Sequence, residues 1–246
     1  MNLMIVLLAT VVAGIATIAG SIAGMRLHIS KRLLDVIIAA SAGLTFSIAA
    51  FGLAPHAFVQ GALGYSFVGF VIGGFLVILL DNILPNTYNL EKFGDRLYSI
   101  LRTDVLASTG LAVHSIPMAF AIGAGFAVSQ SLGLAVAAAV VLKNITSGIA
   151  VIIPLQESGH SRAKIILISS VSLIVILLGG LALSSVLDNA NPVFLSAGVS
   201  FALGAVLYAS ADEILALVRK VSKKHETAVA IFLGFAAGFL ILGMGM

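Results

Sequence analysis

The chain has 246 residues, of which 60% are hydrophobic and only 9% are charged. A soluble domain is about 25% charged, so the composition excludes a soluble enzyme and predicts an integral membrane protein. The net charge of +3 does not indicate a nucleic-acid partner, because the loop cations have a topological role, and the absence of cysteine excludes disulfides and thiolate metal sites.

Eight apolar runs are long enough to cross a bilayer, since a spanning helix needs about 20 mostly apolar residues. They predict an all-α membrane protein with a single transmembrane domain over residues 1–246. The predicted helices cover residues 3–24, 36–54, 65–86, 104–127, 132–155, 164–187, 193–217 and 227–245.

Basic residues are distributed unequally between the predicted loops. Twelve of the 13 Lys and Arg residues lie after the first, third, fifth and seventh helices, and none lies after the second, fourth or sixth. Cytoplasmic loops carry the excess of Lys and Arg, so we expect a multi-pass protein of the inner cell membrane with both termini outside. The longest polar loop, 86–103, favours a short surface helix or a flexible connection.

The fourth predicted helix carries a histidine and a proline near its middle. Pro117 removes one backbone hydrogen bond and displaces the carbonyl of Val113; this either breaks the helix toward a substrate, as in transporters, or only kinks it. His114 and Met118 are four residues apart and share a helix face. Imidazole is a common ligand of zinc-like ions. The alternative role of His114 is a hydrogen bond between helices, and the alternative role of Met118 is packing. Ser115 adjoins His114 but does not share its helix face, so a membrane hydrolase is not expected.

The thirteenth cation, Lys143, lies alone in the middle of the fifth predicted helix (AVAAAVVLKNITSGIAVIIPL). A lysine near the bilayer centre costs roughly 2.5–3.5 kcal/mol and is by default a functional-site candidate. The segments 114–123 and 143–152 resemble each other, which predicts a duplicated transporter core with a midplane site between the fourth and fifth helices. No Asp or Glu lies near the midplane of the fourth, fifth or sixth helix; the acids Asp81 and Asp212-Glu213 lie toward the cytoplasmic ends of the third and seventh.

These motifs, in this order, resemble those of the ZIP (Zrt/Irt-like) family of divalent metal transporters, in particular its compact prokaryotic branch. The resemblance covers essentially the whole chain. It implies a ZIP-like bundle with inverted-repeat character, in which one helix bundle moves past another and carries a metal at the midplane. The matching segments are GLAPHAF (52–58), LLDNILPN (79–86), HSIPMA (114–119), KNITSGIAVIIPL (143–155) and LYASADEI (207–214).

The departures from the family pattern fall on its metal ligands. Met118 and Ser147 stand where the family has Glu, Thr146 replaces a proline, and Ile176 stands at the position of a further Glu. The resemblance assigns the site to the first, second and fifth positions of two motifs. Those positions are His114, Ser115, Met118, Lys143, Asn144 and Ser147.

Two functions remain open at this point. In the first, the protein transports a divalent, zinc-like cation through an altered ligand set, with Lys143 and Pro117 as modulators of the site. The ammonium of Lys143 would then have to be neutral or turned away, because it repels a nearby dication by several kcal/mol or more. The altered set would be His114, Ser115, Met118, Asn144 and Ser147.

In the second, the ammonium of Lys143 replaces the metal and is bonded to Asn144, Ser147 or freed carbonyls. The protein would then transport a non-metal solute or protons, or would not transport. We expect no required cofactor, and a bound zinc, cadmium, iron or manganese ion only in the first case. Membrane lipid is the expected surrounding, and small-residue stretches at 69–74 and 234–239 leave a homodimer open.

Overall fold

The computed structural model describes residues 2–27, 30–58, 63–84, 103–157, 159–220 and 224–243. The predicted polar loop 86–103 therefore lies outside the described residues, apart from Thr103. The regular elements within these ranges are all helical. They are α1 (Leu3–Arg26), α2 (Lys31–Ser47), the π-helix η1 (Ile48–Leu53), α3 (Ala54–Ala57), α4 (Leu63–Ile83), α6 (Thr103–Val128), α7 (Gln130–Glu157), α8 (Arg162–Leu187), α9 (Pro192–Lys220) and α10 (Lys224–Gly243).

Eight membrane-spanning candidates occur in the described part of the chain, which confirms the predicted all-α, eight-helix class. The continuous segment α2–η1–α3 provides one of them, Arg32–Ala57. The helices extend past several predicted ends, because an apolar run stops at the first charge whereas a helix continues into the polar interface. For example, α9 runs on to Lys220, three residues beyond the predicted end at 217.

The helix ends follow from local chemistry. The hydroxyl of Ser30 accepts a hydrogen bond from the backbone N–H of Leu33 at the start of α2, and Ser161 caps α8 in the same way. Such N-caps satisfy backbone donors that a helix leaves unpaired. In the turn between α8 and α9, Asn189 adopts a φ of 59°, a conformation that asparagine tolerates better than most residues.

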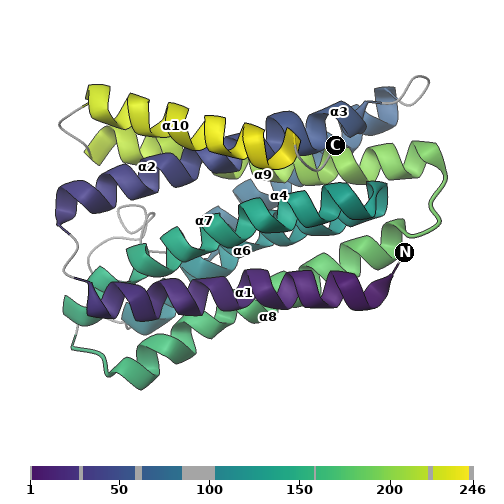
Figure 1. The fold of residues 1–246 in the computed structure, drawn as a ribbon. Helices are drawn as coiled ribbons and strands as arrows, with labels where there is room; N and C mark the ends of the chain where they lie inside the picture. The colour runs from purple at the N-terminus through teal and green to yellow at the C-terminus, as the bar shows by residue number, and fades with distance from the viewer. Residues whose placement is uncertain are drawn as a thin grey trace.

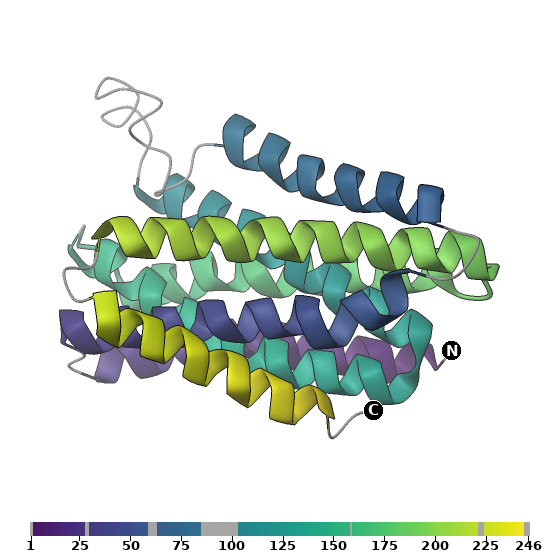
Figure 2. The ribbon, with the colours of Figure 1, turned by 90° about the horizontal axis from the view of Figure 1, so that it is seen from above.

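The helices form two groups (Figure 1). We call them the α1 group (α1, α6, α7 and α8) and the α2 group (α2 with η1 and α3, α4, α9 and α10). Packing is most extensive inside each group, while α6 against α9 and α2 against α7 connect the two. Figure 2 shows α4 at the edge of the bundle beside α9.

Glycines set the closest approaches inside each group. A side chain at Gly20 of α1 would collide with the backbone of Ile145 on α7, and one at Gly73 of α4 would collide with the backbone of Phe201 on α9. Small residues of this kind let membrane helices pack tightly. The stretches 69–74 and 234–239 both pack inside the chain in this manner, against α9 and α2, and the homodimer stays a prediction.

The start of α1 and the end of α10 lie toward the same end of the bundle (Figures 1 and 2). An even number of spans requires this. The side of the membrane on which the two ends lie stays a prediction.

The π-helix η1 ends at Leu53, two residues before Pro55, which lacks a backbone N–H. A π turn before a proline redirects the hydrogen-bonding ladder without ending the helix. The carbonyl of Ala57, at the end of α3, accepts hydrogen bonds from the hydroxyls of Ser196 and Ser200 on α9, both 2.7 Å long. The span therefore continues to Ala57, beyond the predicted end at 54.

Candidate functional site

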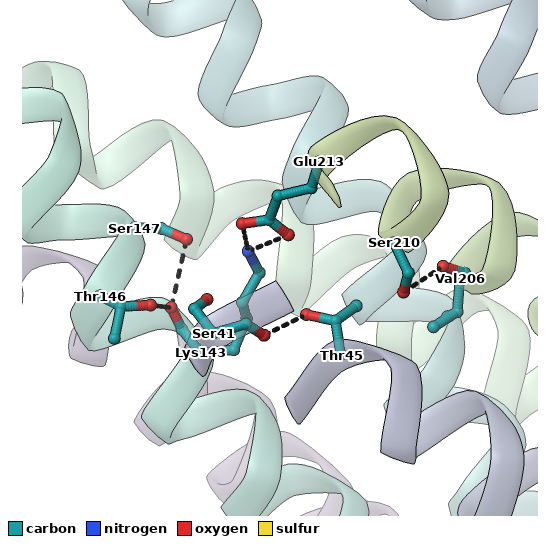
Figure 3. Close-up of polar contacts among 8 residues, drawn as sticks. All are labelled: Ser41, Thr45, Lys143, Thr146, Ser147, Val206, Ser210 and Glu213. Carbon is teal, nitrogen blue, oxygen red and sulfur yellow. Dashed lines mark hydrogen bonds and ion pairs between the residues drawn. The ribbon is translucent and has the colours of Figure 1, made fainter. Parts of the chain in front are cut away.

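Lys143 lies in the middle of α7 and is paired with Glu213 of α9 (Figure 3). Its Nζ donates to both carboxylate oxygens of Glu213, over 2.6 and 2.8 Å. The side chains are only 5% and 14% exposed. No acid was expected near Lys143, and the second function named Asn144, Ser147 or freed carbonyls as its partners. Glu213 corrects this expectation.

The missed partner has a physical explanation. No Asp or Glu lies near the midplane of the fourth, fifth or sixth predicted helix, whereas Glu213 lies nearer one end of α9 and its side chain reaches Lys143. Two long side chains can meet although their Cα atoms differ in depth. The available signal was general, because an intramembrane lysine is normally paired and Asp212-Glu213 is the acidic pair inside the seventh predicted helix.

Buried hydroxyls of α2 and α9 are drawn together with this ion pair in Figure 3. Thr45 on α2 and Ser210 on α9 donate to carbonyls of their own helices, at 3.0 and 2.9 Å. Ser41 on α2 is 3% exposed, and its hydroxyl has no hydrogen-bond partner within the described part of the chain.

His114 lies on α6, partly buried and within electrostatic range of the ion pair. It also interacts electrostatically with Asp212 and Asp81. The charges of His114 and Lys143 therefore lie close enough to influence each other. Across the described residues, no group of three or more His, Cys, Asp or Glu side chains is placed to hold a metal ion.

The two predicted serine ligands make hydrogen bonds inside the α1 group. The hydroxyls of Ser115 and Ser172 are 2.7 Å apart, and Ser172 also lies 3.0 Å from the hydroxyl of Thr17. This row links α6, α8 and α1. The hydroxyl of Ser147 donates to the backbone carbonyl of Lys143 over 3.2 Å. Each hydroxyl oxygen keeps acceptor capacity in these contacts.

The other predicted site residues also lie on α6 and α7. Asn144 donates from Nδ2 to the carbonyl of Ala13 on α1 over 2.6 Å. Met118 is 1% exposed and lies in the same buried cluster as Ile176 of α8. At Pro117 the helix α6 continues without interruption, so this proline does not break the helix.

Comparison with known proteins relates the chain to named transporters along almost its entire length. It is 27% identical over 247 residues to a protein of Shigella dysenteriae serotype 1 (strain Sd197) and 26% identical to one of Escherichia coli O7:K1 (strain IAI39), both named zinc transporter ZupT. Each alignment covers 96% of this chain and 95% of the relative. No protein-family model matches the chain.

These relatives are named as transporters, which agrees with the exclusion of an enzyme. The eight candidate spans in the described residues make the chain a multi-pass membrane protein. Homology and helix composition agree over nearly the full length. The chain is a ZIP-like membrane protein, homologous to the ZupT zinc transporters.

Proposed function

We propose that this protein transports a divalent, zinc-like metal cation across the inner cell membrane. The observation that carries the proposal is its homology to proteins named zinc transporter over 96% of the chain. We place the site at the bilayer midplane between α6 and α7, with both termini outside. Function follows from a site rather than from a fold alone, so the residues at that site need a separate argument.

Glu213 answers the electrostatic objection to a metal near Lys143. A lone ammonium would repel a dication strongly in a low-dielectric site. Here the carboxylate of Glu213 contacts the ammonium through both oxygens, at 2.6 and 2.8 Å. The pair has no net charge when both groups are ionised, so the remaining interaction with a nearby dication is that of a dipole and is much weaker.

The proposed ligand set is built around His114 on α6. Asn144 would contribute its amide oxygen, because its Nδ2 is already bonded to Ala13 and the two ends of an amide point in different directions. Ser115 and Ser147 can offer hydroxyl oxygens with lone pairs left by their present hydrogen bonds. Met118 would supply a thioether, which favours softer ions such as cadmium.

The ion pair also supports the second function, in which Lys143 stands permanently in place of the metal. The ammonium is buried, bonded to both carboxylate oxygens of Glu213, and belongs to a residue that the sequence assigned to the site. In that case the protein would carry a non-metal solute or protons, or would not transport. Metal binding by the purified protein separates the two functions.

The first test is calorimetric titration of the purified protein with zinc, cadmium, manganese and iron(II). Transport of a metal predicts binding by the parent and its loss in His114→Ala, whereas His225→Ala, an exposed histidine of α10, should bind as the parent does. Binding that appears only after Lys143→Glu and Met118→Glu together, and is absent from the parent, would refute metal transport and support the second function.

A further inference from the structure

We propose that the Lys143–Glu213 ion pair is a latch between the two helix groups, closed in the conformation described here. It opens when one group moves relative to the other. Its role in the transport cycle rests on the function proposed above, because transport supplies the reason for such a movement. Its existence as a latch can be tested without any metal.

The pair bridges the two groups at a place where their backbones do not pack together. Lys143 belongs to α7 of the α1 group, and Glu213 belongs to α9 of the α2 group. The backbones of α7 and α9 make little contact with each other, whereas α2 and α6 each pack against both. At this level the Lys143–Glu213 ion pair connects α7 directly to α9.

The contacts inside each group are of a different kind. Gly148 of α7 lies against the backbone of α1 at Thr17, and Gly43 of α2 lies against the backbone of α10 at Ile231. Among the described glycines, every approach that a side chain would turn into a collision with another helix's backbone lies inside one group. These close approaches interlock the helices of the α1 group and, inside the α2 group, the pairs α2–α10 and α4–α9. Among the described glycines, none of them crosses from one group to the other.

The charges make the connection selective for one alignment. An ammonium and a carboxylate buried away from water are stable only while each faces the other, since separating them leaves two uncompensated charges. The Nζ–Oε contacts of 2.6 and 2.8 Å fix the position of α7 against α9. A shift between the groups must break both contacts together.

The hydroxyls on the α2 group keep this latch from being permanent. Ser41 and Thr45 lie one helical turn apart on α2, beside the Lys143 side chain, and Ser210 lies on α9 below Glu213 (Figure 3). The hydroxyl of Ser41 has no hydrogen-bond partner among the described residues. Hydroxyl oxygens accept hydrogen bonds from an ammonium, so in the proposed latch these groups are the partners that Lys143 would take when α7 moves.

The test uses the absence of cysteine from this chain. In Ser41→Cys the new thiol replaces a buried, unpartnered hydroxyl next to the latch, and it is the single reactive thiol of the protein. The rate of its reaction with a small water-soluble methanethiosulfonate reagent, in proteoliposomes without metal, measures how often the two groups part at this place.

In this Ser41→Cys background we expect slow labelling with the pair intact. Labelling should be about ten times faster or more in Lys143→Met and in Glu213→Leu, a ratio within the usual range of coupling free energies. The charge-swapped variant K143E/E213K should label slowly again. Equal rates in all these proteins, or a swapped variant as reactive as the single variants, would overturn the latch.

Two further variants protect the experiment against trivial outcomes. A single change leaves a buried charge unpaired and can prevent folding. The double variant K143M/E213L removes both charges and should therefore be labelled fast. Labelling of the double variant as slow as that of the parent would refute the latch. Arg32→Met breaks the exposed Arg32–Glu226 pair, which lies within the α2 group, and should leave the rate unchanged. If zinc binding is absent but this pattern holds, the proposed function fails and the latch stands.

Discussion

At the scale of single residues, Lys143 and Glu213 are each tolerable only because of the other. Removing one partner of a buried ion pair costs about 3–5 kcal/mol, whereas replacing both with apolar groups of similar size is often neutral. The two side chains are 5% and 14% exposed, which places the pair in this class. We therefore expect the pair to favour one particular alignment of α7 and α9, rather than only to add to the stability of the fold.

The free energy of unfolding tests this expectation. We predict that Glu213→Leu destabilises the protein by about 3–5 kcal/mol, while the double variant K143M/E213L recovers most of the loss. The measurement is reversible unfolding in mixed micelles followed by circular dichroism. The exposed pair gives the matched control, because Glu226→Leu should cost no more than about 1 kcal/mol. A double variant as unstable as the single one would contradict the account.

At this scale the sequence identified Lys143 and His114 as candidate site residues, but it did not identify Glu213 as the partner of Lys143. Lys143 was identified because a buried cation is rare and costly, and His114 because it shares its depth. The partner depended on how α9 is placed against α7, and this arises from packing far along the chain. The hydrogen bonds of Ser115 to Ser172 and of Asn144 to Ala13 were unpredictable for the same reason.

At the scale of elements, apolar length determines the spans, and polar or proline residues determine their ends. The helix predicted over residues 132–155 corresponds to α7, Gln130–Glu157, which is two residues longer at each end. The π-helix η1 was not predicted. Its widened turn depends on how the helix accommodates Pro55, whereas hydrophobicity reports only that the segment is buried in membrane or protein.

Glycine positions within one helix allow a direct test of helix packing. Gly73 of α4 lies against the backbone of Phe201, whereas nothing lies within 4 Å of a side chain added at Gly64 of the same helix. We predict that Gly73→Ala destabilises the protein by about 1–3 kcal/mol through overpacking. Gly64→Ala should be neutral or stabilising by up to about 1 kcal/mol, because alanine favours helix.

The thermal midpoint of each purified variant in the same detergent provides the comparison. A lower thermal midpoint for Gly73→Ala, with no decrease for Gly64→Ala, supports the close crossing of α4 and α9. Equal effects at the two positions would show that helix propensity, rather than packing, governs both.

At the scale of the whole molecule, the residues of the proposed site are divided between the two groups. His114 and Lys143 come from the α1 group, while Glu213 and the hydroxyls of Ser41 and Thr45 come from the α2 group. These polar residues therefore come from both groups. The sequence predicted the number of spans, but their grouping depends on which glycines meet which backbones, and that is visible only in three dimensions.

Transport is the property that this arrangement is proposed to serve, and it belongs to the intact protein in a membrane. Uptake of zinc into proteoliposomes containing the purified protein tests it most directly, with protein-free liposomes as background. The account predicts zinc uptake above background by the parent and by His225→Ala, and loss of most of that uptake in His114→Ala. Uptake by the parent no greater than that of protein-free liposomes, with the protein shown to be folded, would contradict the account.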